Sequence, residues 1–189
     1  MSNIAALDID ANRRARKWSR KELFGRLLWE GLQAPLFAWT PRQFWGFRNS
    51  VLRLFGARIG RHVQIHPTVR IAIPWNLDVQ DHSSIGDRAI IYNLGPIRLG
   101  ASVSVSQNAH LCAGSHDFTK PDLPLIKPPI AIEDGAWVCA DAFVGPGVTV
   151  GSMAIIGARA VVTKDVEPSA IMVGNPARKL KKRRELTHP

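Results

Sequence analysis

Aliphatic residues recur at every sixth position in the segment from Ile132 to Glu167. The segment divides into six hexapeptides, IEDGAW, VCADAF, VGPGVT, VGSMAI, IGARAV and VTKDVE. Each begins with Ile or Val and has Ala or Val at its fifth position. A short fixed period with β-branched residues is typical of a solenoid of strands, in which each turn buries its face against the next. The pattern predicts a mainly β chain that forms a parallel β-helix.

The repeat also predicts the register of the strands. Three hexapeptides should make one triangular coil, so that residues eighteen positions apart stack in columns. Val138 should then lie over Ile156, and Val144 over Val162. The β-branched residue would fill the interior, and the small fifth residue would let the chain turn the corner. Tight backbone geometry should favour a residue without Cβ after the aliphatic one, as at Gly145, Gly151 and Gly157.

The same period is present upstream, but it is interrupted. Residues 59–76 read as one full coil, after which shifts of two residues reset the phase at Ile85 and at Leu99. The segment from Asp117 to Pro129 has four prolines and no period. Because proline excludes interior strand pairing, we expect this segment to be a loop extruded from the coil. The solenoid is thus predicted over residues 59–173, with an extruded loop at 117–129.

Residues 1–58 have a different composition, rich in Leu, Phe and Arg. They hold four of the six tryptophans, namely Trp18, Trp29, Trp39 and Trp45. Apolar residues at helical spacing, divided by Pro35 and Pro41, predict two helical pieces. The apolar stretch 23–39 is too short and too charged to span a bilayer. Two roles remain open: a cap on the open end of the solenoid and contact with a membrane surface.

The net charge of +10 is concentrated at the two ends of the chain. Basic residues cluster between Arg13 and Lys21, and residues 174–189 form a basic tail. Such clusters attract phosphates or anionic lipid. No recognisable nucleic-acid-binding module accompanies them, so we expect no nucleic-acid partner. The two cysteines, without a disulfide framework or a secretory signal, lead us to expect reduced thiols and a cytoplasmic protein.

Three further motifs carry a family resemblance: LCAGSHD at 111–117, VVTKDV at 161–166 and GNPAR at 174–178. With the hexapeptides, they resemble the left-handed β-helix acetyltransferases, which include the maltose/galactoside, nodulation and chloramphenicol-type enzymes. FAWTPRQFWGFRNSVLRLFGARIG at 37–60, PWNL at 74–77 and YNLG at 92–95 are most similar to the colanic acid biosynthesis acetyltransferases. The resemblance covers about residues 28–178. It implies a left-handed coil, against the usual right-handed crossover preference, and a homotrimer with active sites at the subunit interfaces.

The activity that the resemblance implies is acetyl transfer from acetyl-CoA, without a metal, to a sugar hydroxyl in exopolysaccharide biosynthesis. An alcohol is a poor nucleophile until a base takes its proton, and a neutral imidazole is suited to this task. His116 is the candidate base, in a direct transfer within a ternary complex. Asp117 could orient the imidazole or could begin the loop with an Asx turn. Tyr92 and Asn93 would bind the acceptor.

The resemblance also implies the contacts with coenzyme A. Trp137 would pack against the pantetheine arm, the alternative being a tryptophan packed in the core. The backbones of Ala140 and Ala158 would bond to the pantetheine amides. The adenine end and its phosphates would meet Thr163, Lys164 and Arg178, since cationic side chains are the expected phosphate partners.

Two other classes of protein remain as alternatives. A γ-carbonic-anhydrase-like zinc enzyme would use three histidines, but His82, His110 and His116 lie 28 and 6 positions apart, which does not match the spacing in that family. A non-catalytic scaffold would dock on a membrane through its helices and basic tail. For the enzyme, the acceptor would be a sugar or a lipid-linked oligosaccharide, which would place the protein in the cytoplasm or peripherally at the inner membrane face.

Overall fold

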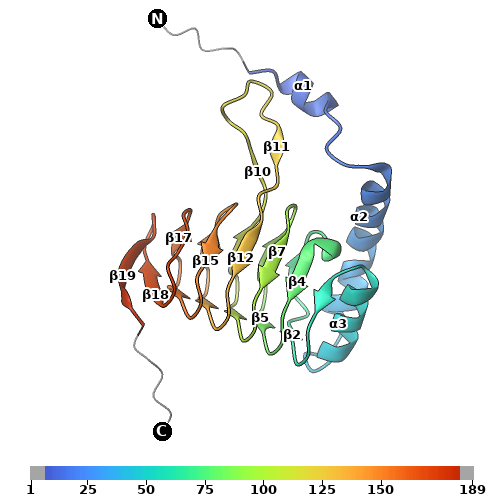
Figure 1. The fold of residues 1–189 in the computed structure, drawn as a ribbon. Helices are drawn as coiled ribbons and strands as arrows, with labels where there is room; N and C mark the ends of the chain where they lie inside the picture. The colour runs from blue at the N-terminus through green and yellow to red at the C-terminus, as the bar shows by residue number, and fades with distance from the viewer. Residues whose placement is uncertain (1–6, 184–189) are drawn as a thin grey trace, which may run out of the picture.

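The computed structural model describes residues 7–183 of the 189-residue chain. Its centre is a parallel β-solenoid of triangular coils, with helices at one end (Figure 1). A hairpin over residues 115–126, which we call the arm, projects from the solenoid. The helical segments precede the solenoid: α1 (Ile9–Arg14), α2 (Arg20–Gln33), the π-helix η1 (Ala34–Ala38) and α3 (Trp45–Leu54). Short strands alternate with tight corners, and each parallel strand of the coils buries an aliphatic residue.

Three sheets form the sides of the solenoid, and their strands run parallel except for the last one. The first sheet contains β1 (Arg58–Ile59), β4 (Leu77–Val79), β7 (Ile97–Leu99), β12 (Ile130–Ile132) and β15 (Thr149–Val150). The second sheet contains β2 (Gln64–Ile65), β5 (Ser84–Ile85), β8 (Ser104–Val105), β13 (Trp137–Val138), β16 (Ile155–Ile156), β18 (Ala170–Val173) and β19 (Arg178–Lys182). The third sheet contains β3 (Arg70–Ile71), β6 (Ile90–Tyr92), β9 (His110–Cys112), β14 (Phe143–Val144) and β17 (Val161–Val162). A 3-10 turn, η2 (Pro74–Asn76), precedes β4.

The strand register confirms the predicted columns. Val138 pairs with Ile156, and Val144 pairs with Val162. In the coils that follow the N-terminal helices, the paired residues lie twenty positions apart, as for Ile65 and Ile85. Two extra residues in each of these coils account for the phase shifts seen in the sequence.

The corners depend on two backbone positions of the repeat. At the second position the next coil passes very close: a Cβ added to Gly86 would lie 2.8 Å from the Gln107 nitrogen. This confirms the expected preference for glycine there. Most of the fourth positions have a left-handed backbone, which the sequence does not reveal because residues other than glycine usually occupy them. The non-glycine residues with this backbone are His62, His82, Arg88, Ser102, Asn108, Asp141, Met153, Arg159 and Ser169.

The N-terminal helices cap the first coil. Trp29 and Leu52 are fully buried in the same apolar core as the solenoid interior. Carbonyl groups on the open edge of the coil accept hydrogen bonds from helix side chains: Trp29 to Ile71, Gln33 to Val69, Arg48 to Ile65, Asn49 to Val63 and Arg53 to Ile59. An uncovered edge would template further strand pairing, so these side chains terminate the ladder.

At the opposite end, the basic tail is partly structured. Strand β19 pairs antiparallel with β18, with Met172 opposite Lys179 and Val173 opposite Arg178. The backbone pairing places the exposed side chains of Arg178–Lys182 on the outside of the last coil. Residues 184–189 of the predicted tail lie outside the described residues.

The arm contains a feature that the predicted loop does not include. This is a two-stranded antiparallel pair outside the coil, β10 (Ser115–His116) and β11 (Leu125–Ile126). Proline is absent from the four paired residues, so their hydrogen bonds are not blocked. The excursion therefore begins at Ser115, two residues before the expected start.

Candidate active site

His116 lies in β10, at the base of the arm, and its side chain is exposed. Its Nδ1 atom is 2.6 Å from the carbonyl oxygen of Leu123, which lies just before the second strand of the arm. A carbonyl oxygen can only accept a hydrogen bond, so Nδ1 must carry the proton. In the neutral ring Nε2 then keeps its lone pair. The contact thus selects the tautomer that a general base needs.

The carboxylate of Asp117 is engaged within its own loop. Its Oδ1 accepts hydrogen bonds from the Thr119 amide at 3.1 Å and the Thr119 hydroxyl at 2.5 Å, the arrangement of an Asx turn. Bonding to Thr119 and the nearby Lys120 lowers the pKa of this carboxyl group. Among the residues that the structure describes, the hydrogen-bond partner of the His116 imidazole is Leu123, not Asp117.

The Leu123 carbonyl is held from a second direction. Leu123 has a φ of +43°, an unusual backbone conformation for leucine. Its oxygen also accepts a hydrogen bond at 2.6 Å from the side-chain amide of Asn12, which lies in α1. The Asn12 side chain is fixed in turn by Lys17, whose Nζ donates to Oδ1 at 2.6 Å. The sequence gives no signal for this contact between distant segments.

Tyr92 and Asn93 lie on the same edge of the solenoid as the arm. Tyr92 pairs with Cys112 in the third sheet, and its side chain is 41% exposed. Asn93 is fully buried, and its amide group bonds to both backbone groups of Ile73. This geometry gives Asn93 a structural role, while Tyr92 stays available to an acceptor.

The two cysteines are free and half-buried. Burial raises the pKa of both the Cys112 and the Cys139 thiol. A raised pKa leaves less of the nucleophilic thiolate at neutral pH. The environment therefore favours direct transfer over an acyl-cysteine intermediate.

The residues expected to bind coenzyme A occupy two corners of the solenoid. Trp137 projects from the second sheet, 43% exposed, and its Nε1 donates to the Ser106 hydroxyl at 2.9 Å. Ala140 and Ala158 lie one coil apart at the corner between the second and third sheets. Thr163 and Lys164 follow β17 at the corner between the third and first sheets, and Arg178 begins β19. Within one chain, the third sheet separates these two corners.

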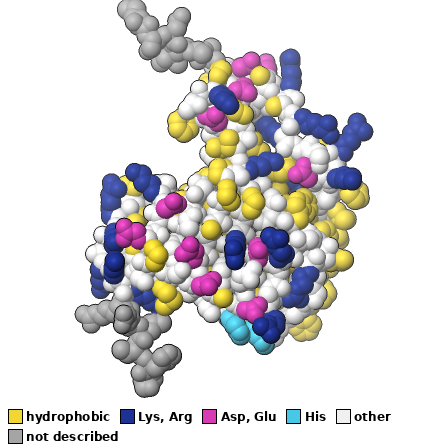
Figure 2. Space-filling model, viewed as in Figure 1, with side chains coloured by type: hydrophobic (Ala, Val, Ile, Leu, Met, Phe, Trp, Pro, Cys, Tyr) yellow, Lys and Arg dark blue, Asp and Glu magenta, His cyan; other side chains and the backbone are white. Residues whose placement is uncertain are grey.

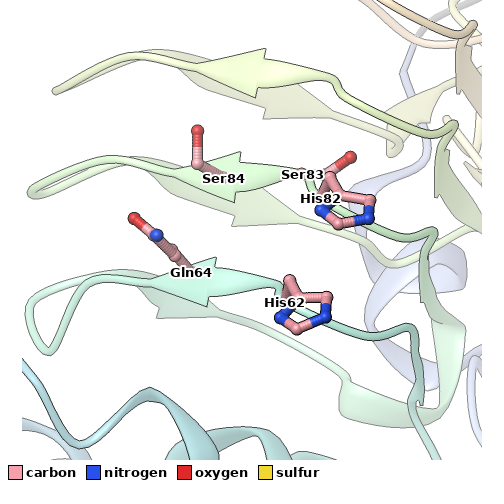
Figure 3. Close-up of a pocket in the computed structure, with 5 residues that line it drawn as sticks. All are labelled: His62, Gln64, His82, Ser83 and Ser84. Atoms are coloured by element: carbon pink, nitrogen blue, oxygen red, sulfur yellow. The ribbon is translucent and has the colours of Figure 1, made fainter.

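A polar strip on the second sheet was not found from the sequence. His62, Gln64, His82, Ser83 and Ser84 line an open cavity of about 410 Å³, in which the two imidazole rings stack at 4.9 Å (Figure 3). The outward column continues through Ser104 to Trp137. The twenty-residue spacing of Gln64, Ser84 and Ser104 is the signal that could have revealed it.

The three histidines of the zinc alternative do not converge. His82 belongs to the polar strip, His110 faces outward from the third sheet, and His116 is on the arm. Residues 7–183 contain no group of three or more possible metal ligands. None of the helices within this range is long and apolar enough to cross a membrane.

A parallel solenoid of hexapeptides, with a histidine held at the base of an extruded arm, defines the class of hexapeptide-repeat acyltransferases. The comparisons with known proteins agree. The chain is 41% identical over 158 residues to WcaF of Escherichia coli strain K12, named as a colanic acid biosynthesis acetyltransferase, covering 84% of this chain and 87% of that protein. The chain belongs to the hexapeptide-repeat acetyltransferase family. No protein-family model matches it.

Solved structures show the same fold. A maltose O-acetyltransferase from Clostridium difficile 630 superposes with a TM-score of 0.79 at 25% identity, over 88% of this chain and 90% of that one. A hexapeptide-repeat acetyltransferase from Vibrio cholerae, solved with acetyl coenzyme A, gives 0.82 at 22% identity, over 90% and 93%. The predicted fold class, a left-handed parallel β-helix, and the predicted enzyme class, an acetyltransferase, are confirmed.

Proposed function

We propose that this acetyltransferase moves an acetyl group from acetyl-CoA to a sugar hydroxyl, with His116 as the general base. The observation that carries the proposal is the contact between His116 Nδ1 and the Leu123 carbonyl. It leaves Nε2 unprotonated and exposed on the arm, which is what proton abstraction from an alcohol requires. The sugar acetyltransferases among the relatives support the class of acceptor.

The transfer would proceed in one ternary complex. Nε2 of His116 takes the proton of the acceptor hydroxyl, and the oxygen attacks the carbonyl carbon of the thioester. Backbone N–H groups would stabilise the oxyanion that forms. The carbon–sulfur bond then breaks, and the thiolate of coenzyme A takes the proton from the His116 imidazolium. No acyl-enzyme is needed, in keeping with the raised pKa of the two thiols.

A homotrimer would complete the site. His116 and Lys164 lie at one corner of the solenoid, and Ala140 and Ala158 at another, with a whole sheet between them. A neighbouring copy related by a threefold axis would bring its own alanine corner to the arm of the first copy, since a cyclic assembly places unlike edges together. Each site would then draw on two subunits.

The cofactor contacts follow from this arrangement. The exposed face of Trp137 would pack against the pantetheine arm, and the backbones of Ala140 and Ala158 would bond to its amides. The exposed residues near the last coils would meet the adenine end and its phosphates: Thr163, Lys164 and Arg178. Complexes of similarly folded enzymes with acetyl coenzyme A or with coenzyme A support this part of the proposal.

The acceptor we propose is a sugar of an exopolysaccharide repeat unit, carried on a lipid. Tyr92, exposed beside the base of the arm, would contact it. The naming of the 41% identical relative for colanic acid biosynthesis supports this choice. Such an acceptor would place the enzyme in the cytoplasm, at the inner face of a membrane.

The experiment is release of coenzyme A from acetyl-CoA with a panel of free sugars, nucleotide sugars and lipid-linked oligosaccharides. His116→Ala should lower kcat by about 10²–10⁴-fold, the usual contribution of a general base, and should keep acetyl-CoA binding. His62→Ala, an exposed histidine in the second-sheet cavity, is the matched control. Turnover that survives His116→Ala would remove His116 as the base. A protein that neither turns over nor binds acetyl-CoA would be a scaffold.

A further inference from the structure

Helix α2 turns an apolar face toward solvent. Its stripe of Leu23, Phe24, Leu27 and Leu28 has the spacing of one helix face, and these side chains are 47%, 69%, 69% and 45% exposed. A surface helix normally turns such a stripe toward the core. We call these four residues, together with Leu54 of α3 at 84% exposure, the apolar face.

The orientation of α2 is fixed by its other side. Trp29 is fully buried and donates to the Ile71 carbonyl at 2.6 Å. The backbone of Gly25 packs against Trp75, and an added Cβ would lie 3.0 Å from the indole ring. The helix therefore cannot rotate the apolar face inward without breaking the cap of the solenoid.

The apolar face borders an open groove. Phe24, Leu28, Leu54, Phe55 and Trp75 line a hollow of about 590 Å³ between α2, the end of α3 and the turn before β4. Lys21 and Glu22 stand at its rim. An exposed apolar surface with a hollow of this kind is characteristic of an interaction site.

Cationic side chains precede the apolar face along the chain. The exposed ones lie on α1, in the segment after it and in the first turn of α2: Arg13, Arg14, Arg16, Arg20 and Lys21. Figure 2 shows hydrophobic side chains along the edge of the molecule that carries the helices, with Lys and Arg side chains next to them. An apolar helix face flanked by cations matches the boundary between acyl chains and anionic headgroups.

We propose that the apolar face docks on an anionic lipid bilayer. The leucines and Phe24 would enter the acyl region, while Lys21 and the neighbouring arginines would meet the phosphates. A second copy of the chain fits less well, because a symmetric contact through this face would bring two cationic segments together. Because the cap side chains bind the first coil, docking would hold the whole solenoid with its capped end at the membrane.

The test is flotation of the full chain with vesicles. Phosphatidylglycerol with phosphatidylethanolamine provides the anionic surface, and phosphatidylcholine the neutral one. Wild type should float with the anionic vesicles, less so at high salt. The double variant Phe24→Ser, Leu27→Ser should lower the bound fraction at least about tenfold, because each buried side chain of this size contributes about that factor. The control pair is Val173→Ser, Leu180→Ser, exposed apolar residues at the opposite end.

Charge is tested separately. Lys21→Glu should weaken binding to anionic vesicles by about fivefold or more. Arg98→Glu makes the same change in net charge on the exposed side of the first sheet and should leave binding unchanged. Equal losses in the two variants would mean that net charge alone attracts the protein, and the docking face would be rejected.

Two results would overturn the proposal. One is unchanged flotation of the Phe24, Leu27 double variant. The other is a change in its oligomeric state by sedimentation, which would assign the face to a contact between copies. Turnover with a water-soluble acceptor should stay at the wild-type level in the double variant. The docking proposal and the proposed reaction can therefore fail separately.

Discussion

His116 and Leu123 face each other across the arm, with the imidazole Nδ1 2.6 Å from the carbonyl oxygen. The same oxygen accepts a hydrogen bond from the side-chain amide of Asn12. The orientation of the imidazole therefore depends on a segment more than a hundred residues away. A backbone carbonyl, rather than a carboxylate, thus fixes the tautomer. A carbonyl carries no proton of its own at any physiological pH, so this orientation does not change with protonation of a partner.

Asp117 should be dispensable for the chemistry. Asp117→Ala removes the Asx turn with Thr119 but leaves the partner of His116 in place. We expect kcat to fall by less than about tenfold, whereas loss of a triad carboxylate costs about 10⁴-fold. Asp117→Asn, which can keep the turn, should be nearer to wild type. Steady-state kinetics with the identified acceptor would decide, and a loss in Asp117→Asn comparable to that in His116→Ala would make Asp117 part of the catalytic machinery.

Asn12 should act as a positioning residue for His116. Asn12→Ala removes one hydrogen bond to the Leu123 carbonyl, and we expect kcat to fall by about three- to tenfold, the worth of one such bond. The KM for acetyl-CoA should not change. The ¹⁵N chemical shifts of the His116 ring should show a larger share of the other tautomer. Arg13→Ala, on the same short helix, is the control, and identical ring shifts in wild type and Asn12→Ala would refute the role.

Arg48 should be essential for the stability of the cap. Its guanidinium is fully buried and bonds to the carbonyls of Ile65, Pro41 and Arg42 and to the Thr40 hydroxyl. Arg48→Met leaves these acceptors without a donor, which should lower the free energy of unfolding by at least about 3 kcal/mol. Arg48→Lys should rescue little, because an ammonium cannot reproduce the planar fork. Urea unfolding gives the values, with the exposed Arg42→Met as a near-neutral reference.

His110 should make the fold sensitive to acid. Burial between Tyr92 and Phe143 lowers the pKa of this imidazole below its ordinary value of about 6.5. Below that pH the unfolded chain binds a proton more readily than the folded one, so stability is complete above about 6.5 and falls as the pH drops. His110→Gln should flatten the dependence of Tm on pH between about 7.5 and 5.5. Parallel curves of Tm against pH for wild type and variant would show that His110 contributes nothing. The pKa of His66 is also lowered by burial, but His66 is present in both proteins, so its contribution cancels in the comparison.

The sequence was informative wherever a structural rule repeats. One period of six predicts the columns of Val138 and Val144 and the glycine positions. Departures from the same period mark the phase shifts at Ile85 and Leu99. The left-handed corner residues did not follow, since His62 or Met153 in such a conformation is stabilised by the neighbouring coils and not by its own preference. Resemblance, rather than periodicity, supplied the handedness of the coil.

Motifs name the candidate residues of the site one by one, but they do not predict how these residues are arranged. His116 was recognisable from its motif, whereas its partner Leu123 was not, because any residue can offer a carbonyl. The burial of Asn93 depends on its bonds to Ile73 one coil below, which local sequence does not indicate. The outward stripe on α2 has the same periodicity as an inward one, so only the packing of Trp29 and Gly25 distinguishes the two.

The contact between Asn12 and the arm has a consequence for the order of synthesis. Asn12 bonds to the carbonyl of Asp122, 110 residues later in the chain. At about 5–20 residues per second, the segment around α1 leaves the ribosome roughly 5–20 seconds before the arm exists. The cap helices differ, because the first coil that they cover is synthesised directly after them. A nascent chain can therefore form the first coil on its cap helices several seconds before Asn12 can bond to the arm that carries His116.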